Sequence, residues 1–139
     1  MSKLPETVLI TGANRGMGLE FVKQFRDAPD FSKVIFAACR TPSKAAELNK
    51  LAAESKTSKI HVIQLDPNSD QDIASAVKQV EQLLNGKGLN LVFNNAGFAD
   101  PGQQLGKLTR TSLMEHCQCN CFGPLLIAQT NTPLAKGCF

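Results

Sequence analysis

A glycine-rich segment that directly follows an apolar, β-branched run has the composition of a phosphate-binding turn. The run covers residues 7–11, and the segment after it reads Gly12-Ala13-Asn14-Arg15-Gly16-Met17-Gly18. The first glycine of such a turn permits a sharp change of direction, and the later ones allow close approach of ligand and helix. Free N–H groups and the positive dipole end at the start of the next helix attract phosphate. An ordinary loop is the alternative, which the strand–turn–helix setting disfavours. No Gly-Lys-Ser/Thr triplet follows, so a P-loop is excluded.

Two arginines predict which nucleotide this turn binds. Arg15 lies inside the turn, and Arg40 ends the second apolar run. Sites for NAD(H) place a carboxylate at that point to accept from the ribose 2′-hydroxyl, whereas an arginine suits a 2′-phosphate. Asp30 belongs to the loop before the second run, at the opposite end of the sheet. The arrangement predicts NADP(H) as the cofactor; the alternative is a pair of solvated surface arginines.

The elements that must position these residues alternate between strand and helix. Parallel pairing is expected, since strands separated by helical crossovers run in the same direction. The pattern therefore predicts an α/β fold with a doubly wound parallel sheet of about four strands and helices on both faces. The expected strands are Thr7–Thr11, Lys33–Cys39, Ile60–Leu65 and Leu89–Phe93, and the expected helices are Gly16–Asp27, Pro42 through Leu51, a segment capped by Ser69 that stops at Gly86, and Ser112–Gln129.

Two motifs together resemble the short-chain dehydrogenase/reductase family. Thr11–Gly18 is similar to its cofactor signature, and Asn94-Asn95-Ala96-Gly97, directly after the fourth expected strand, is similar to its second signature. The resemblance covers about residues 7–134. The segment Gly88-Leu89-Asn90-Leu91 is most similar to the sniffer-like carbonyl reductase branch of the family. It implies a Rossmann sheet, a single NADP-binding domain over residues 1–139, and a small-molecule carbonyl substrate.

The resemblance also implies roles for individual residues. Asp66 is expected beside the adenine ring, or simply in the turn Asp66-Pro67-Asn68. Asn94 is expected to brace the fourth strand against the cofactor, and Asn120 to support a catalytic lysine through a water molecule. The full set expected to bind cofactor is Gly12, Asn14, Arg15, Gly16, Met17, Gly18, Arg40, Asp66, Asn94, Ala96 and Gly97.

The family's proton-transfer residues have no counterpart in this sequence. The family uses a Tyr, a Lys four residues later and an upstream Ser, yet the sequence contains 0 tyrosines. We therefore expect a domain truncated at its C-terminus and inactive on its own. Two hypotheses follow: a fragment or shortened product of an NADPH-dependent carbonyl reductase, or a non-catalytic nucleotide-binding or interaction protein.

Composition and charge limit the binding partners and the cellular location that we expect. The formal net charge is +3, and the basic residues are scattered singly, so neither nucleic acid nor a membrane surface is an expected partner. No signal peptide or membrane-spanning run is visible, and 5 cysteines without a disulfide framework are expected to be reduced, which predicts a cytoplasmic protein. Cys117, Cys119 and Cys121 lack zinc-site spacing and are expected to be buried or half-buried thiols. Neither His61 nor His116 has a Ser or Asp partner at a suggestive position, so the sequence does not indicate a hydrolytic Ser-His-Asp triad.

The expected strand order is third, second, first, fourth, which leaves Leu89–Phe93 at the sheet edge. An apolar edge strand exposes unpaired N–H and C=O groups. The sequence therefore predicts a marginally stable monomer that self-associates through this edge, aggregates, or borrows a strand from a partner chain.

Overall fold

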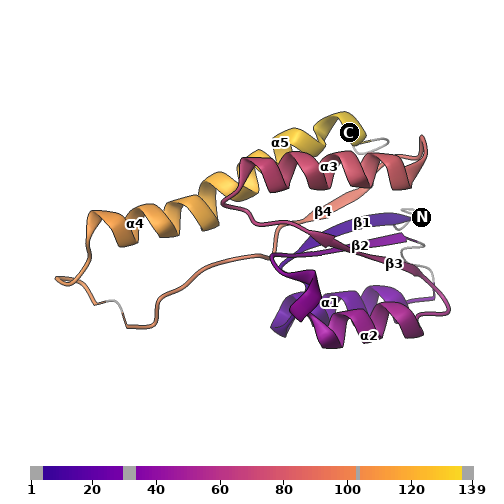
Figure 1. Ribbon diagram of the computed structural model, residues 1–139, viewed down its shortest axis with the longest axis horizontal. Helices are drawn as coiled ribbons and strands as arrows, with labels where there is room; N and C mark the ends of the chain where they lie inside the picture. The colour runs from indigo at the N-terminus through magenta and orange to yellow at the C-terminus, as the bar shows by residue number, and fades with distance from the viewer. Residues whose placement is uncertain (1–4, 30–33, 103, 136–139) are drawn as a thin grey trace.

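The computed structural model describes residues 5–29, 34–102 and 104–135. Helices and strands alternate through most of this length (Figure 1). The strands are β1 Thr7–Thr11, β2 Val34–Cys39, β3 Lys59–Gln64 and β4 Leu91–Phe93. The helices are α1 Gly16–Asp27, α2 Ala46–Glu54, α3 Asp70–Leu84, α4 Arg110–Cys117 and α5 Gly123–Asn131, with 3₁₀ turns at Pro42–Lys44 and Thr132–Leu134 and a π-helical turn at Gln118–Phe122.

The four strands form one parallel sheet in the order β3-β2-β1-β4. This order and the parallel pairing confirm the doubly wound fold class. Helices α1 and α2 lie against one face of the sheet, while α3 and α5 lie against the other (Figure 1). The carboxyl ends of β1, β2 and β4 consequently meet at one edge, where the glycine-rich turn follows β1.

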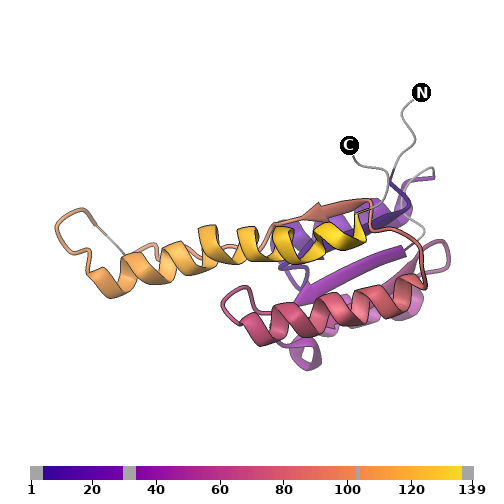
Figure 2. The ribbon, with the colours of Figure 1, turned by 90° about the horizontal axis from the view of Figure 1, so that it is seen from above.

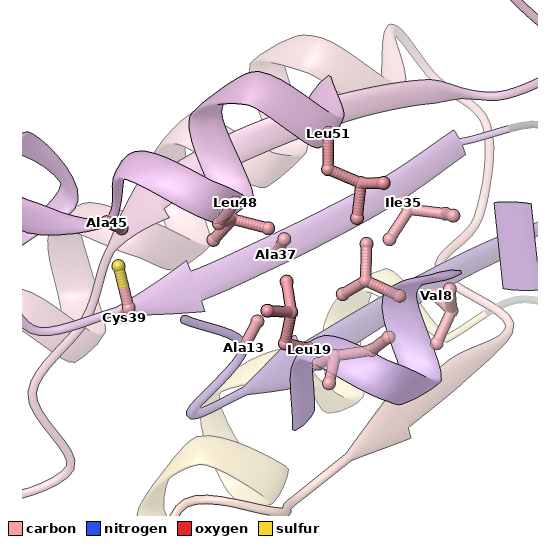
Figure 3. Close-up of a cluster of buried hydrophobic side chains, with 11 residues drawn as sticks. Val8, Ala13, Leu19, Ile35, Ala37, Cys39, Ala45, Leu48 and Leu51 are labelled. Carbon is pink, nitrogen blue, oxygen red and sulfur yellow. The ribbon is translucent and has the colours of Figure 1, made fainter. Parts of the chain in front are cut away.

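Two apolar cores follow from the alternation of side chains along the strands. Val8 and Ile10 of β1 pack toward α1 and α2, and Figure 3 shows this cluster. Leu9, between them, packs with Phe36 against α3 and α5. Both faces of β1 are buried, as expected when parallel strands are covered by helices on each side.

The fourth strand is shorter than predicted because the polar residue near its start binds β1 instead. Asn90 Oδ1 accepts the Thr7 N–H at 3.1 Å, and Thr7 Oγ1 accepts the Asn90 N–H at 2.9 Å. Leu89 lies outside the regular ladder but makes an isolated parallel bridge with Ala135. Regular pairing of β4 with β1 therefore begins only at Leu91.

The helix caps agree in part with the sequence pattern. Ser69 Oγ accepts the Asp72 N–H at 3.1 Å, which confirms the predicted cap of α3. The last helix begins earlier than predicted, at Arg110, because Thr109 and Ser112 form a reciprocal capping box. The chain after Pro42 forms a 3₁₀ turn before α2 rather than one continuous helix. β3 lies one residue earlier than predicted, and Lys33 and Asp30 fall outside the described residues.

The predicted helix from Ser112 to Gln129 is interrupted. Residues 118–122 form a π-helical turn between α4 and α5. Two long-range contacts coincide with this turn: Asn120 bonds the backbone of Phe98, and Gly123 packs so closely on Pro67 that a Cβ would come within 2.7 Å. Local sequence could not predict the break, since both partners lie far away in the chain.

None of the helices within the described ranges is long and apolar enough to span a bilayer.

Candidate nucleotide-binding site

The glycine-rich turn connects β1 to α1 in a conformation that glycine favours. Gly12 has φ +66° and Gly16 has φ +53°, both in the left-handed region. A Cβ on Gly12 would lie 2.9 Å from the Ala96 Cα, and one on Gly18 would collide with the Gly12 carbonyl. A Cβ on Gly16 would meet nothing within 4 Å, so the space above this residue is open. The turn thus packs tightly on Ala96 and on its own backbone at one side, while at the other side the backbone of Gly16 is open to a ligand.

The residues between these glycines are exposed. Asn14, Arg15 and Gly16 face solvent, and the Met17 side chain is 73% exposed. Gly18 and Leu19, by contrast, are buried under the sheet edge where α1 packs on β1. The first turn of a helix carries N–H groups without intrahelical acceptors. This end of α1 therefore offers donors to an anion from the solvent side.

Asn95 is the residue that fastens this turn, and the predicted site omitted it. Its Nδ2 donates to the Thr11 carbonyl at 3.0 Å, and its backbone N–H donates to Thr11 Oγ1 at 3.1 Å. Ala96 N–H donates to the same hydroxyl at 3.0 Å. Asn94, the predicted brace, is exposed and donates to the Pro124 carbonyl at 3.2 Å, so it links β4 to α5. The adjacent pair of asparagines in the motif was the available signal.

The two arginines follow adjacent strands. Arg15 is the N-cap residue of α1, just after β1, and Arg40 directly follows β2. Both are exposed. The turn is also tied to β2, because the Ala13 N–H donates to the Ala38 carbonyl at 3.0 Å. Since β1 and β2 pair directly and run parallel, both arginines lie at the same edge of the sheet.

Asp66 occupies the turn that the sequence indicated. Its Oδ1 accepts the Asn68 N–H at 3.0 Å, and its own N–H donates to Asp72 Oδ2 at 3.2 Å. The residue is half-buried and lies two positions after the end of β3. These hydrogen bonds show that Asp66 belongs to the turn Asp66-Pro67-Asn68, as the sequence predicted. Because β2 and β3 pair in parallel, Asp66 and Arg40 lie at the same edge of the sheet.

Asn120 holds the loop after β4. Its Oδ1 accepts the Phe98 N–H at 2.7 Å, and its Nδ2 donates to the Phe98 carbonyl at 2.7 Å. A Cβ on Gly97 would lie 3.5 Å from Asn120 Oδ1. Gly97 and Asn120 are therefore neighbours, and the π-helical turn carries Asn120 toward the second motif.

The cysteines differ from the prediction in part. Cys39 and Cys119 are buried, and burial raises the pKa of each thiol. Cys117 and Cys121 are exposed, so the expectation that they are buried or half-buried is wrong. The reason is that positions 117 and 121 lie about one turn apart on the exposed side of the helix, while position 119, between them, is buried near Asp66.

The two histidines lie apart from the glycine turn. His61 stacks on Phe36 with ring centroids 5.5 Å apart. His116 Nδ1 lies 2.8 Å from the Ser112 carbonyl, and its ring meets Phe98 edge-on.

A parallel sheet with a glycine turn between β1 and α1 defines a nucleotide-binding α/β protein. Residues 6–137 match the sequence family described as short chain dehydrogenase. The chain belongs to this family, whose members are oxidoreductases. Among curated relatives, norsolorinic acid ketoreductase of Dothistroma septosporum is 34% identical over 130 residues, covering 94% of this chain and 48% of the relative. Human retinol dehydrogenase 5 is 32% identical over 129 residues, covering 93% and 38%.

Among solved structures, carbonyl reductases are similar to this chain. The NADPH-bound carbonyl reductase from chicken fatty liver aligns with TM-score 0.89 and 34% identity, covering 94% of this chain and 52% of its own. Carbonyl reductase Sniffer of D. melanogaster aligns with TM-score 0.86 and 32% identity, covering 94% and 52%. These matches confirm the Rossmann-like fold and the predicted family. The chain spans about half the length of the relatives it matches.

Proposed function

We propose that residues 1–139 form a single NADP(H)-binding domain of a carbonyl-reducing short-chain oxidoreductase. The observation that carries the cofactor choice is a pair of exposed arginines, Arg15 within the glycine turn and Arg40 directly after the neighbouring strand β2. A guanidinium pairs with phosphate oxygens through charge-assisted hydrogen bonds. The similar carbonyl reductase from chicken fatty liver was solved with NADPH bound, which supports the same choice.

The described residues suit a dinucleotide. Gly12 and Gly18 let the turn pack closely on Ala96 and on its own backbone, Gly16 leaves open space for a pyrophosphate, and the start of α1 supplies N–H donors. We propose that Asp66 contacts the adenine ring, and that Ala96, which packs on Gly12, and the neighbouring Gly97 contact the cofactor from the β4 side. NADPH, when bound, supplies a hydride. The role of this chain is to hold the cofactor at the edge where β1, β2 and β4 end.

The substrate class and the activity of this chain are separate proposals. The names of the relatives point to ketones or aldehydes and their alcohols, so we propose a small carbonyl compound as the substrate of the whole protein. The sequence contains 0 tyrosines, so it lacks the proton donor that the family resemblance implies. We propose that the purified 139-residue chain oxidises no NADPH above background with ketone or aldehyde substrates. Robust cofactor-dependent reduction would refute this.

The alternative function is non-catalytic nucleotide binding or pairing with another chain. The observation that favours it is the edge strand β4, which pairs with β1 on one side only among the described strands. We propose that a second copy pairs with β4 whenever no nearer strand covers that edge.

We also propose a cytoplasmic location for the protein, because buried reduced thiols such as Cys39 and Cys119 suit a reducing compartment.

Charge reversal at one arginine tests the cofactor proposal. Arg40→Asp should weaken NADPH binding by about 1–3 kcal/mol, the range for charged hydrogen bonds. It should not weaken NADH binding, because a carboxylate at this position can accept from the ribose 2′-hydroxyl. Arg110→Asp is the matched control, because Arg110 is an equally exposed arginine at the start of α4. It changes the net charge equally without approaching the turn. Equal losses of NADPH affinity in both variants would mean that only the overall charge matters.

A further inference from the structure

The loop after β4 is held by side chains of the helical segment that follows it. The chain leaves β4, extends past the sheet edge and returns along α4, which continues into α5 (Figure 2). Ser112, His116 and Asn120 follow one another at intervals of four residues along this returning segment. Residues four apart share one face of a helix. His116 and Asn120 both contact the loop at the same residue, Phe98.

Asn120 and His116 hold different parts of Phe98. Asn120 bonds the backbone N–H and the backbone carbonyl of Phe98, each at 2.7 Å. The His116 ring meets the Phe98 ring with centroids 4.9 Å apart and an interplanar angle of 60°. Aromatic rings favour such edge-on packing because the rim of one ring is positive and the face of the other is negative. One side chain therefore holds the backbone of the loop, and the other holds its aromatic ring.

The orientation of the His116 ring is fixed from within the helix. Its Nδ1 lies 2.8 Å from the Ser112 carbonyl, which can only accept, so the hydrogen of this bond is on Nδ1. Ser112 is 8% exposed; its hydroxyl donates to the Thr109 carbonyl at 2.9 Å and accepts the Thr109 N–H at 3.1 Å. The imidazole is therefore anchored to the capped first turn of α4 and meets Phe98 in a set position.

The loop that carries Phe98 begins beside the second half of the proposed dinucleotide site. The residues proposed for the adenosine half, Arg40 and Asp66, follow β2 and β3. The sheet order β3-β2-β1-β4 reverses its direction at β1, and dinucleotides bind across such a switch point. With the adenosine half at the ends of β2 and β3, the other half extends toward the end of β4. Ala96 and Gly97 lie there, directly before Phe98.

We propose that His116 is a positioning residue for the nicotinamide half of NADP(H), an inference that rests on the proposed function. His116 acts through Phe98, because the contact between the two rings holds the loop and with it Ala96 and Gly97. The adenosine half lies on the other side of the glycine turn and does not depend on this contact. Loss of the imidazole should therefore weaken the binding of the nicotinamide half alone.

Two ligands separate the two halves of the cofactor. Adenosine 2′,5′-bisphosphate carries the adenine and the 2′-phosphate without the nicotinamide, whereas NADPH carries all three. The ratio of their dissociation constants, measured by titration calorimetry, gives the contribution of the nicotinamide half. His116→Ala removes the ring, and His116→Phe keeps one for the edge-on contact. Met114→Ala is the matched control, because Met114 is 45% exposed on α4 and lies two positions from His116, off the face that His116 occupies.

We expect His116→Ala to weaken NADPH binding by about twofold to tenfold, the range for one edge-on aromatic pair, and to leave the affinity for adenosine 2′,5′-bisphosphate unchanged. His116→Phe should restore NADPH binding, and Met114→Ala should change neither affinity. Equal losses for both ligands in His116→Ala would indicate a general loosening of the fold and overturn the inference, as would an unchanged affinity for NADPH. If the unaltered chain binds neither ligand, the proposed function itself fails and this inference falls with it.

Discussion

Asn95, just after β4, fixes the end of the neighbouring strand β1 through its bonds to Thr11. The Asn95 Nδ2 donates to the Thr11 carbonyl at 3.0 Å, and the Asn95 N–H donates to the Thr11 hydroxyl at 3.1 Å. Thr11 is 1% exposed, so its carbonyl and hydroxyl depend on protein partners. The glycine turn begins at the next residue. Its position is therefore set jointly by β1 and by the motif after β4.

Replacing Asn95 should loosen this turn. Asn95→Ala removes the donor to a buried carbonyl, so we expect a loss of about 1–3 kcal/mol in the free energy of unfolding. Nucleotide affinity should fall as well. Asn94→Ala is the control, since Asn94 is exposed and makes a single 3.2 Å bond to the Pro124 carbonyl. Urea unfolding of both variants measures the difference, and equal destabilisation would contradict the assigned role.

The cap of α3 gives an independent prediction about stability. Ser69 Oγ accepts the Asp72 N–H, and the helix it starts packs Ile73 and Val80 into the core. Ser69→Ala should cost about 0.5–2 kcal/mol, the usual range for loss of an N-cap. Ser75, exposed on the same helix, is the control, and Ser75→Ala should be nearly neutral. Thermal unfolding that ranks the two variants the other way would contradict this.

His61 should make stability depend on pH. Burial, and secondarily the charge of Lys59, lowers the pKa of His61 below its ordinary value of 6.5. The unfolded chain then binds more protons than the folded one in the interval between the two pKa values. Stability from this residue is therefore fully present above pH 6.5 and is lost as the pH falls through that interval.

Removing the imidazole tests this dependence. His61→Phe keeps a ring to stack on Phe36, whose centroid lies 5.5 Å from that of His61. The variant should lose less stability than the unaltered chain between about pH 7 and pH 5, where unperturbed carboxylates still remain largely ionised. Urea unfolding at both pH values is the measurement. An identical change in the two proteins would mean that other groups cause the dependence.

Much of the fold was predictable because it depends on local pattern. Short apolar runs separated by helical segments indicated four parallel strands, and the two motifs indicated the sheet edge that we propose for the site. The Ser69 cap was also readable, since its partner Asp72 lies three residues away. These features need only neighbours in the sequence.

Features that depend on distant partners were not predictable. Asn90 shortens β4 because it bonds Thr7, and Asn120 bonds Phe98 at the point where the last helix is interrupted. The same reason explains the omission of Asn95, whose partner Thr11 lies 84 positions earlier. The role expected for its neighbour Asn94, bracing the fourth strand against the cofactor, stays a prediction. Choosing between adjacent asparagines requires knowing which one faces β1.

Titration of the unaltered chain with NADPH and with NADH, under identical buffer and salt, tests the central claim most directly. We predict saturable NADPH binding that is tighter than NADH binding, together with amide shifts confined to residues 12–18, Arg40 and the loop after β4. Arg15 and Arg40 can pair with the 2′-phosphate that only NADPH carries. Equal affinity for the two cofactors, or no binding of either, would contradict the account.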